Sequence, residues 1–174
     1  MAKPSRPSDP RNSNSQLRTF FVSTSTAQRR PILQTHRMAT LLIDVIRSYT
    51  LAEKFKVHEF VVMRNHVHLL ITIDGAMTIE KAMQLIKGGF SFRGKKELGF
   101  RGEIWQRGFS DVRVTDEESF REHQQYIFDN PVKAGMVSSP EQYPYCSAYL
   151  RKVKRTAAKA AKVGAAGGTT KVVP

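Results

Sequence analysis

Residues 57–73, VHEFVVMRNHVHLLITI, contain two strand-like segments with a short polar turn between them. Residues 57–63 and 66–73 are rich in β-branched and other apolar side chains, which favours β-structure. Only Arg64 and Asn65 separate the segments, which is the length of a tight hairpin, and asparagine tolerates a positive φ. We therefore predict an antiparallel pair of strands here.

The second segment has two different faces. Successive side chains of a strand point to opposite sides, so one side is wholly apolar, formed by Val67, Leu69, Ile71 and Ile73. His66 and His68 share the other side. Two neutral imidazoles at this spacing can hold one divalent ion and leave positions open for a phosphate oxygen. A strand histidine is more often a surface or hydrogen-bonded residue, so the pair alone does not establish a metal site.

The segments before and after this hairpin also have clear periodicities. Residues 19–25 are dense in aromatic and β-branched types and predict a first strand. Residues 36–54 have apolar side chains at helical spacing and predict an amphipathic helix. Residues 78–98 predict a second helix, which we expect Gly88 and Gly89 to break or kink.

The remaining elements complete a recognisable order. Residues 103–114 predict a fourth strand. Thr115 and Glu118 form a capping box at the start of a third helix, and Pro131 is expected to end that helix near Asn130. The order predicts an α+β, ferredoxin-like split β-α-β fold, with a four-stranded antiparallel sheet and an extra C-terminal helix.

The third predicted helix carries three side chains suited to chemistry. Tyr126 and Asn130 are four residues apart and share a helical face with His123. A phenol has an unperturbed pKa of about 10, so a nucleophilic Tyr126 would need a base or positive charge nearby. Taken singly, Tyr126 is more easily explained as a packing tyrosine, and Asn130 as a helix terminator before Pro131.

The net charge of +13 is concentrated at the two ends of the chain. Residues 1–18 carry four Lys or Arg and one Asp, and residues 151–174 carry seven Lys or Arg and no acidic residue. We predict that both segments are disordered basic arms around one domain at 19–150, and that nucleic acid is the partner. A purely solubilising role for the arms stays open.

The cellular setting is predicted from what the sequence lacks. The single cysteine, Cys146, has no partner for an internal disulfide, and no apolar run approaches the length of a membrane span. No apolar leader follows the polar N-terminus. We expect a cytoplasmic, nucleoid-associated protein of bacterial type with no membrane partner.

Three motifs in order resemble a known family. They are NHVHLL at residues 65–70, IWQRGF at 104–109 and YIFDNPVKAG at 126–135. Together they look like the REP-associated tyrosine transposases, which belong to the IS200-like superfamily of single-tyrosine HUH transposases. The resemblance covers roughly residues 19–150 and not the tails.

The resemblance implies a specific chemistry. His66, His68 and the side-chain oxygen of Asn130 would hold Mg²⁺ or Mn²⁺, and Tyr126 would attack a DNA phosphorus atom. The products would be a 5′-phosphotyrosine and a free 3′-hydroxyl, and the reverse reaction would rejoin the strand. His123 is either a proton relay for this tyrosine or a packing residue. The implied substrate is single-stranded hairpin DNA, cleaved by a monomer or a homodimer.

We also predict a surface that contacts DNA outside the reacting atoms. The basic candidates for phosphate contacts are Lys87, Arg93, Lys95, Lys96 and Arg107. The aromatic candidates for stacking on unpaired bases are Phe90, Phe92, Trp105 and Phe109. Aromatic side chains are more often part of a core, so this assignment competes with a packing role.

Three alternatives stay open. Another His-hydrophobic-His nuclease, such as a relaxase, is disfavoured because Tyr143 and Tyr145 lie outside the third helix, in a proline-containing loop, and are expected to be structural. A non-catalytic or domesticated sequence-specific DNA-binding protein is a second alternative, although both histidines, the tyrosine and the asparagine are all present. A basic ferredoxin-like interaction module would leave the three motifs unexplained.

Overall fold

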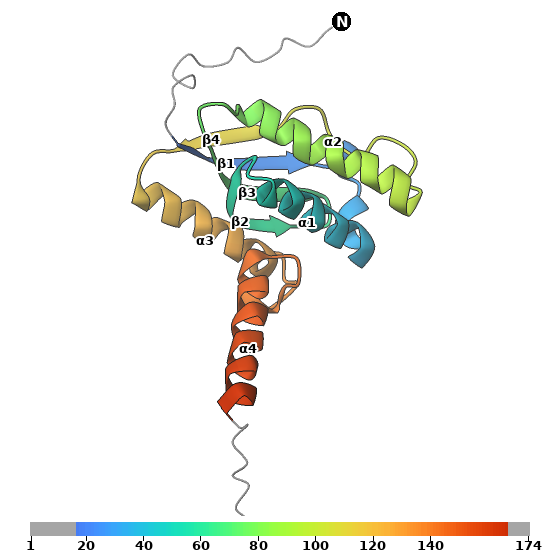
Figure 1. Ribbon diagram of the computed structural model, residues 1–174. Helices are drawn as coiled ribbons and strands as arrows, with labels where there is room; N and C mark the ends of the chain where they lie inside the picture. The colour runs from blue at the N-terminus through green and yellow to red at the C-terminus, as the bar shows by residue number, and fades with distance from the viewer. Residues whose placement is uncertain (1–16, 167–174) are drawn as a thin grey trace, which may run out of the picture.

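A four-stranded antiparallel sheet with strand order β2-β3-β1-β4 forms the centre of the protein (Figure 1). The computed structural model describes residues 17–166. The strands and helices are β1 (Arg18–Ser25), α1 (His36–Leu51), β2 (Lys56–Val62), β3 (His66–Ile73), α2 (Ile79–Leu98), β4 (Ser110–Val114), α3 (Glu117–Lys133) and α4 (Ser147–Ala166). Three short 3-10 turns lie at Ala27–Arg29, Ile32–Gln34 and Pro140–Gln142. The predicted α+β, ferredoxin-like arrangement is confirmed.

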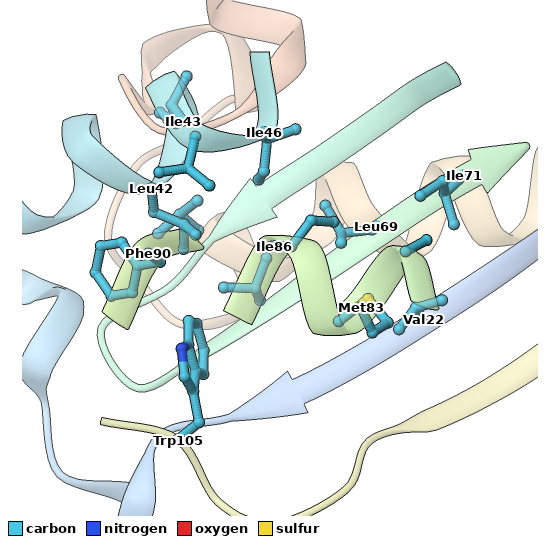
Figure 2. Packing of buried hydrophobic residues seen from close by; sticks show 14 of the residues in the cluster. Val22, Leu42, Ile43, Ile46, Leu69, Ile71, Met83, Ile86, Phe90 and Trp105 are labelled. Atoms are coloured by element: carbon cyan, nitrogen blue, oxygen red, sulfur yellow. The ribbon is translucent and has the colours of Figure 1, made fainter. Parts of the chain in front are cut away.

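The larger hydrophobic core lies between the sheet and the pair α1 and α2. It contains the apolar side of β3, including Leu69 and Ile71, together with Val22 of β1. Leu42 of α1 and Ile86 of α2 close it from the other side, and Figure 2 shows these side chains meeting. Burial of this apolar stripe explains why both amphipathic helices pack on the same face of the sheet.

A second, smaller core covers the opposite face of the sheet. Leu70 of β3 and Ile127 of α3 are both fully buried there, together with Tyr143 and Cys146 from the segment after α3. Seven of the eight residues of β3 are buried, so this strand is covered on both faces. The structure thereby places α3 against the face that carries His68.

The second helix is continuous where the sequence predicts a break at Gly88 and Gly89. A Cβ added at Gly89 would lie 2.9 Å from the hydroxyl oxygen of Tyr49, so the glycine allows α1 to approach α2 closely. A glycine in a helix interior is about 1 kcal/mol less favourable than an alanine. Contact between the two helices offsets this cost. The prediction of a break was wrong because it considered the helix in isolation.

The cap and the end of α3 also differ from the prediction. Asp116, rather than Thr115, is the N-cap, and its carboxylate accepts a hydrogen bond from the Ser119 N–H at 2.8 Å. The helix continues through Pro131 to Lys133, so the proline does not end it at Asn130. It ends in a Schellman motif, in which the Met136 N–H donates to the Pro131 carbonyl at 3.0 Å and Gly135 has a φ of 66°.

Residues 103–109 do not form the strand predicted for them. Only Ser110–Val114 pairs with β1 as a strand, and Trp105 makes an isolated bridge to Thr26. The Ala27 N–H donates to the Ile104 carbonyl at 2.8 Å, and the Gln106 N–H donates to the Ser25 carbonyl at 2.9 Å. The positive φ of 72° at Gly108 interrupts a regular ladder.

Two predicted boundaries are corrected by the structure. The predicted N-terminal arm at 1–18 ends inside β1, because Arg18 is 2% exposed and donates to the carbonyls of Asp74 and Met77. Residues 1–16 lie outside the described residues. The predicted disordered tail at 151–174 is helical as far as residue 166 within α4. Alanine, lysine and arginine are strong helix formers, so this segment is helical without burying a core.

None of the helices found in residues 17–166 is long and apolar enough to cross a membrane.

A buried carboxylate joins three elements on the second face of the sheet. Glu59 of β2 is 3% exposed. It accepts hydrogen bonds from Gln124 of α3 at 2.6 Å and from Ser147 of α4 at 2.5 Å. Arg151 of α4 donates to both of its oxygens at 2.7 Å and lies 5.3 Å from the ring of Phe128. These partners satisfy the buried charge and hold α3 and α4 to β2.

We expect Glu59→Gln to lower the free energy of unfolding by about 2–3 kcal/mol, because a neutral amide cannot replace the charge opposite Arg151. Glu97→Gln is the matched control, since Glu97 also pairs with an arginine, Arg93, but at the surface of α2. No measurable change is expected for the control. Urea denaturation followed by circular dichroism measures both variants. Equal losses would contradict the role assigned to Glu59.

Candidate active site

Strand β3 and helix α3 bring four of the predicted site residues together. The Nε2 atom of His66 lies 3.4 Å from the Oδ1 atom of Asn130. The rings of His68 and Tyr126 meet edge to face, with centroids 5.1 Å apart, and the two histidine rings are 4.9 Å apart. A single chain therefore supplies all four side chains of the predicted set.

Strand β1 leaves space for this group and supplies an aromatic residue that the sequence analysis missed. Ser23 and Ser25 are the cross-strand partners of His68 and His66, so only small side chains stand opposite the histidines. The ring of Phe21 stacks on His68 at 5.4 Å and meets the edge of Tyr126 at 5.5 Å. Alternation along β1 predicts that Phe21 lies on the face opposite to its core-facing neighbours. The side chains that Phe21 contacts could not be predicted, because they depend on strand pairing and on the position of α3.

The orientation of His66 is set by two asparagines. Its Nδ1 lies 2.8 Å from the Asn65 Oδ1 and donates to it in the tautomer that leaves a lone pair on Nε2. The Asn130 side-chain amide donates to the Tyr126 carbonyl at 3.3 Å, which turns its oxygen toward His66. Two electron-donating atoms then face each other at 3.4 Å, an arrangement that a bound cation would stabilise.

Both histidines are neutral at neutral pH. Burial lowers the pKa of His66, and it outweighs the contact with Asn130, which raises that pKa. Burial and then the nearby His66 lower the pKa of His68 to about 4. His68 is 6% exposed, and its Nδ1 atom is buried without a hydrogen-bond partner among residues 17–166. A neutral imidazole held only by packing is free to accept a ligand.

The donor set fits a divalent ion. Two imidazole nitrogens and one amide oxygen suit Mn²⁺ better than Mg²⁺, which strongly prefers oxygen. Within the described part of the chain, no three His, Cys, Asp or Glu side chains are grouped so that they could hold a metal. A third protein ligand beside His66 and His68 would therefore be Asn130.

His123 lies beside this group on α3. It is half-buried, and its Nδ1 atom donates to the Ser119 carbonyl at 2.7 Å. This bond leaves the lone pair on Nε2. The ring packs on Phe21, with centroids 4.6 Å apart. Packing is thus observed directly, and the available nitrogen is compatible with a proton relay.

Three of the residues predicted to contact DNA make contacts within the fold. The Lys87 ammonium donates to the carbonyls of Gln106 and Gly108 at 2.8 and 2.7 Å, and burial lowers its pKa. Trp105 is 7% exposed and donates to the Lys87 carbonyl at 3.1 Å. Phe90 is fully buried in the larger core. Their aromatic and basic character gave no signal that distinguishes packing from DNA contact.

The other residues of this set lie at or near the surface. Arg93 pairs with Glu97, whereas Phe92 is 65% exposed. The exposed basic residues are Lys95, Lys96 and Arg107. Phe109 packs partly against the larger core. The exposed members stay predictions for DNA contact.

The two tyrosines of the loop after α3, Tyr143 and Tyr145, have structural roles, as predicted. Tyr143 is 5% exposed, and its hydroxyl donates to the Val62 carbonyl at 2.9 Å. Burial is the main cause that raises its pKa to about 12. Tyr145 shares a hydrogen bond of 3.1 Å with His36. Tyr126 is 47% exposed, so a substrate can reach its hydroxyl.

Comparison with known proteins shows the family of the chain. The family model described as "Transposase IS200 like" matches residues 15–130. A REP-associated tyrosine transposase of Escherichia coli (strain K12) is 28% identical over 138 residues, which are 79% of each chain. A Haemophilus influenzae protein assigned to the same group is 29% identical over 135 residues, which are 68% of this chain and 76% of that protein.

A solved structure has the same fold. It is a REP-associated tyrosine transposase bound to a REP hairpin, with a TM-score of 0.67 and 24% sequence identity. The match covers 90% of this chain and 87% of the other.

We expect Lys87→Met to lower the free energy of unfolding by about 1 kcal/mol, because two loop carbonyls lose their donor. Lys95→Met, eight residues further along α2 at an exposed position, should leave stability unchanged. Thermal unfolding of both variants measures the difference. A stable Lys87→Met protein with weakened DNA binding would restore Lys87 as a phosphate contact.

Proposed function

The chain belongs to the IS200-like transposase family, and we propose that it cleaves and rejoins single-stranded hairpin DNA through a 5′-phosphotyrosine. The observation that carries this proposal is the meeting of two strand histidines with the tyrosine and asparagine of α3. His66 Nε2 lies 3.4 Å from Asn130 Oδ1, and the rings of His68 and Tyr126 are 5.1 Å apart. Packing alone does not require two neutral imidazoles, an amide oxygen and an accessible phenol in one place.

Tyr126 is the proposed nucleophile. Its phenolic oxygen forms a bond to the phosphorus atom of the scissile phosphate, while the bond from phosphorus to the 3′-oxygen breaks. The phenolic proton passes to a base, for which the free Nε2 of His123 is the candidate, and the 3′-oxygen takes up a proton to become a hydroxyl. Attack by that hydroxyl on the phosphotyrosine reverses both bond changes and rejoins a strand.

His66, His68 and Asn130 are the proposed ligands of Mn²⁺ or Mg²⁺. When bound, the ion would polarise the scissile phosphate and stabilise the charge that develops on the leaving oxygen. Asn65 holds His66 in one tautomer, and the amide of Asn130 is fixed by the Tyr126 carbonyl. Two of the three proposed ligands, His66 and Asn130, are thereby oriented by their own neighbours before substrate arrives.

Hairpin DNA is the proposed substrate because of the similarity to REP-associated tyrosine transposases, one of which was solved with a REP hairpin. Helix α4 supplies further phosphate contacts in this proposal. Its exposed basic residues are Lys152, Lys154, Arg155, Lys159 and Lys162, and its sequence contains no acidic residue. One chain holds the four site residues, which supports a monomer as the cleaving unit.

The first test is Tyr126→Phe, which removes one oxygen and leaves the ring. With Mn²⁺ and labelled hairpin DNA from the repeats flanking the gene, the wild-type chain should give a covalent band on a denaturing gel. The variant should give none, with its DNA affinity retained. Tyr149→Phe, at a half-exposed tyrosine of α4, is the control and should give the band. Cleavage by Tyr126→Phe would rule out this nucleophile, and binding without any adduct would favour the DNA-binding alternative.

The second test is His68→Ala, measured by calorimetric titration of Mn²⁺ in the absence of DNA. Loss of a ligand should weaken Mn²⁺ binding at least about tenfold. His58→Ala is the control, because His58 is a half-buried histidine of β2 whose pKa is also lowered by burial, but it hydrogen-bonds to Thr72 at 2.7 Å. Unchanged Mn²⁺ binding by a folded His68→Ala protein would exclude His68 as a ligand.

A further inference from the structure

Two consecutive residues beside His66 have an unfavourable backbone conformation. Gln28 and Arg29 both have a φ of 53°. The Arg30 N–H donates to the Ala27 carbonyl at 3.1 Å, so these residues occupy the centre of a tight turn of type I′ character. Such positions usually hold Gly, Asn or Asp, because other side chains clash with the backbone there. Strain of this kind persists only where neighbouring contacts hold it, and it gathers at functional sites.

The contacts that hold this turn come from the residue next to His66. The side-chain amide of Asn65 donates to the Arg29 carbonyl at 3.2 Å, and its oxygen faces the His66 Nδ1 at 2.8 Å. Asn65 thus bridges the strained turn and the proposed metal ligand. Thr26 reinforces the link, because its hydroxyl lies within bonding distance of the carbonyls of Arg30 and Asn65, at 2.6 and 3.0 Å.

The two arginines of the turn have different surroundings. Arg30 is used by the fold, since its guanidinium donates to the carbonyls of Ala27 and Glu103. Arg29 is exposed, and no side-chain hydrogen bond or ion pair of its guanidinium is found among residues 17–166. Its backbone carbonyl is nevertheless bound by the Asn65 amide, whose oxygen faces the His66 Nδ1, so the arginine lies next to this histidine.

A cation beside a proposed metal site repels the ion unless an anion lies between them. A DNA phosphate removes this conflict, because it can face a metal ion with one non-bridging oxygen and a guanidinium with the other. The turn therefore keeps a positive charge next to His66 at the expense of backbone strain.

We propose that Arg29 binds a phosphate of the DNA strand that enters the site at His66 and Asn130, with Asn65 as the residue that positions both. This inference rests on the proposed function and adds a contact that the three sequence motifs do not contain. Arg29 lies before α1, far in sequence from the NHVHLL motif, and only the fold brings it to His66.

The test compares Arg29→Gly with Gln28→Gly, both in the Tyr126→Phe background with Mn²⁺, so that binding is measured without cleavage. Either glycine relieves the strained φ, but only the first removes a charge. The probe is fluorescent single-stranded hairpin DNA from the repeats flanking the gene, followed by anisotropy over a range of salt concentrations. Arg29→Gly should weaken binding about tenfold and reduce the salt slope by about 0.7, the value for one phosphate contact on a single strand.

Gln28→Gly should bind as the parent does, and Arg29→Lys should keep the slope because it keeps the charge. An unchanged slope and affinity in Arg29→Gly, or an equal loss in Gln28→Gly, would overturn the proposal. The adduct assay on the wild-type chain tests the proposed function separately. If the wild-type chain forms the adduct and Arg29→Gly does not change DNA binding, the proposed function is supported and only the role of Arg29 is contradicted. A parent chain that binds no single-stranded DNA overturns both.

Discussion

The arrangement of the whole protein depends on the burial of one strand from both sides. Seven of the eight residues of β3 are buried, so a cover on one face is not enough. Helices α1 and α2 enclose its apolar side, and α3 must occupy the other. Because strand residues alternate, the side that α3 covers is the side of His68. Burial of Leu70 by α3 therefore also brings Tyr126 over His68. The same packing of α3 on β3 forms the smaller core and assembles the site.

Helix α3 is held to that face by two kinds of contact. Ile127 supplies apolar burial, and Gln124 supplies a directed hydrogen bond to the buried carboxylate of Glu59. Apolar contact tolerates small shifts along the helix axis, whereas a hydrogen bond to a carboxylate does not. Tyr126 stands between these two residues in the sequence. Its position over the sheet is consequently fixed by neighbours on either side, and the Schellman motif after Lys133 fixes the end of the helix that carries Asn130.

The sequence predicted the order of elements along the chain, the hairpin at Arg64 and Asn65, and which side chains share a face of β3 or of α3, because alternation and helical spacing are local properties. The resemblance to a known family, rather than local spacing, joined the four residues that meet between β3 and α3. Prediction from the sequence failed where a distant contact decides the outcome. The predicted break at Gly88 and Gly89 is absent because Gly89 packs against Tyr49, and the contacts of Lys87 with the Gln106 carbonyl and of Trp105 with the Lys87 carbonyl were not foreseen. Phe21 and Arg29 were missed since their importance comes from strand register and from a turn whose residues are unusual for it. Basic composition suggested disorder for α4, although alanine and lysine also favour helix.

The carboxylate of Glu59 links the site to the order in which the chain is synthesised. Its charge is balanced only when Ser147 and Arg151 arrive, about ninety residues after β2 has left the ribosome. Until then this face of the sheet lacks Tyr143, Cys146 and Arg151, which pack or bond beside α3. A chain that ends before α4 would thus carry His66, His68, Tyr126 and Asn130 with Glu59 buried but without its counter-charge, so the segment after these residues stabilises the face of the sheet on which they meet.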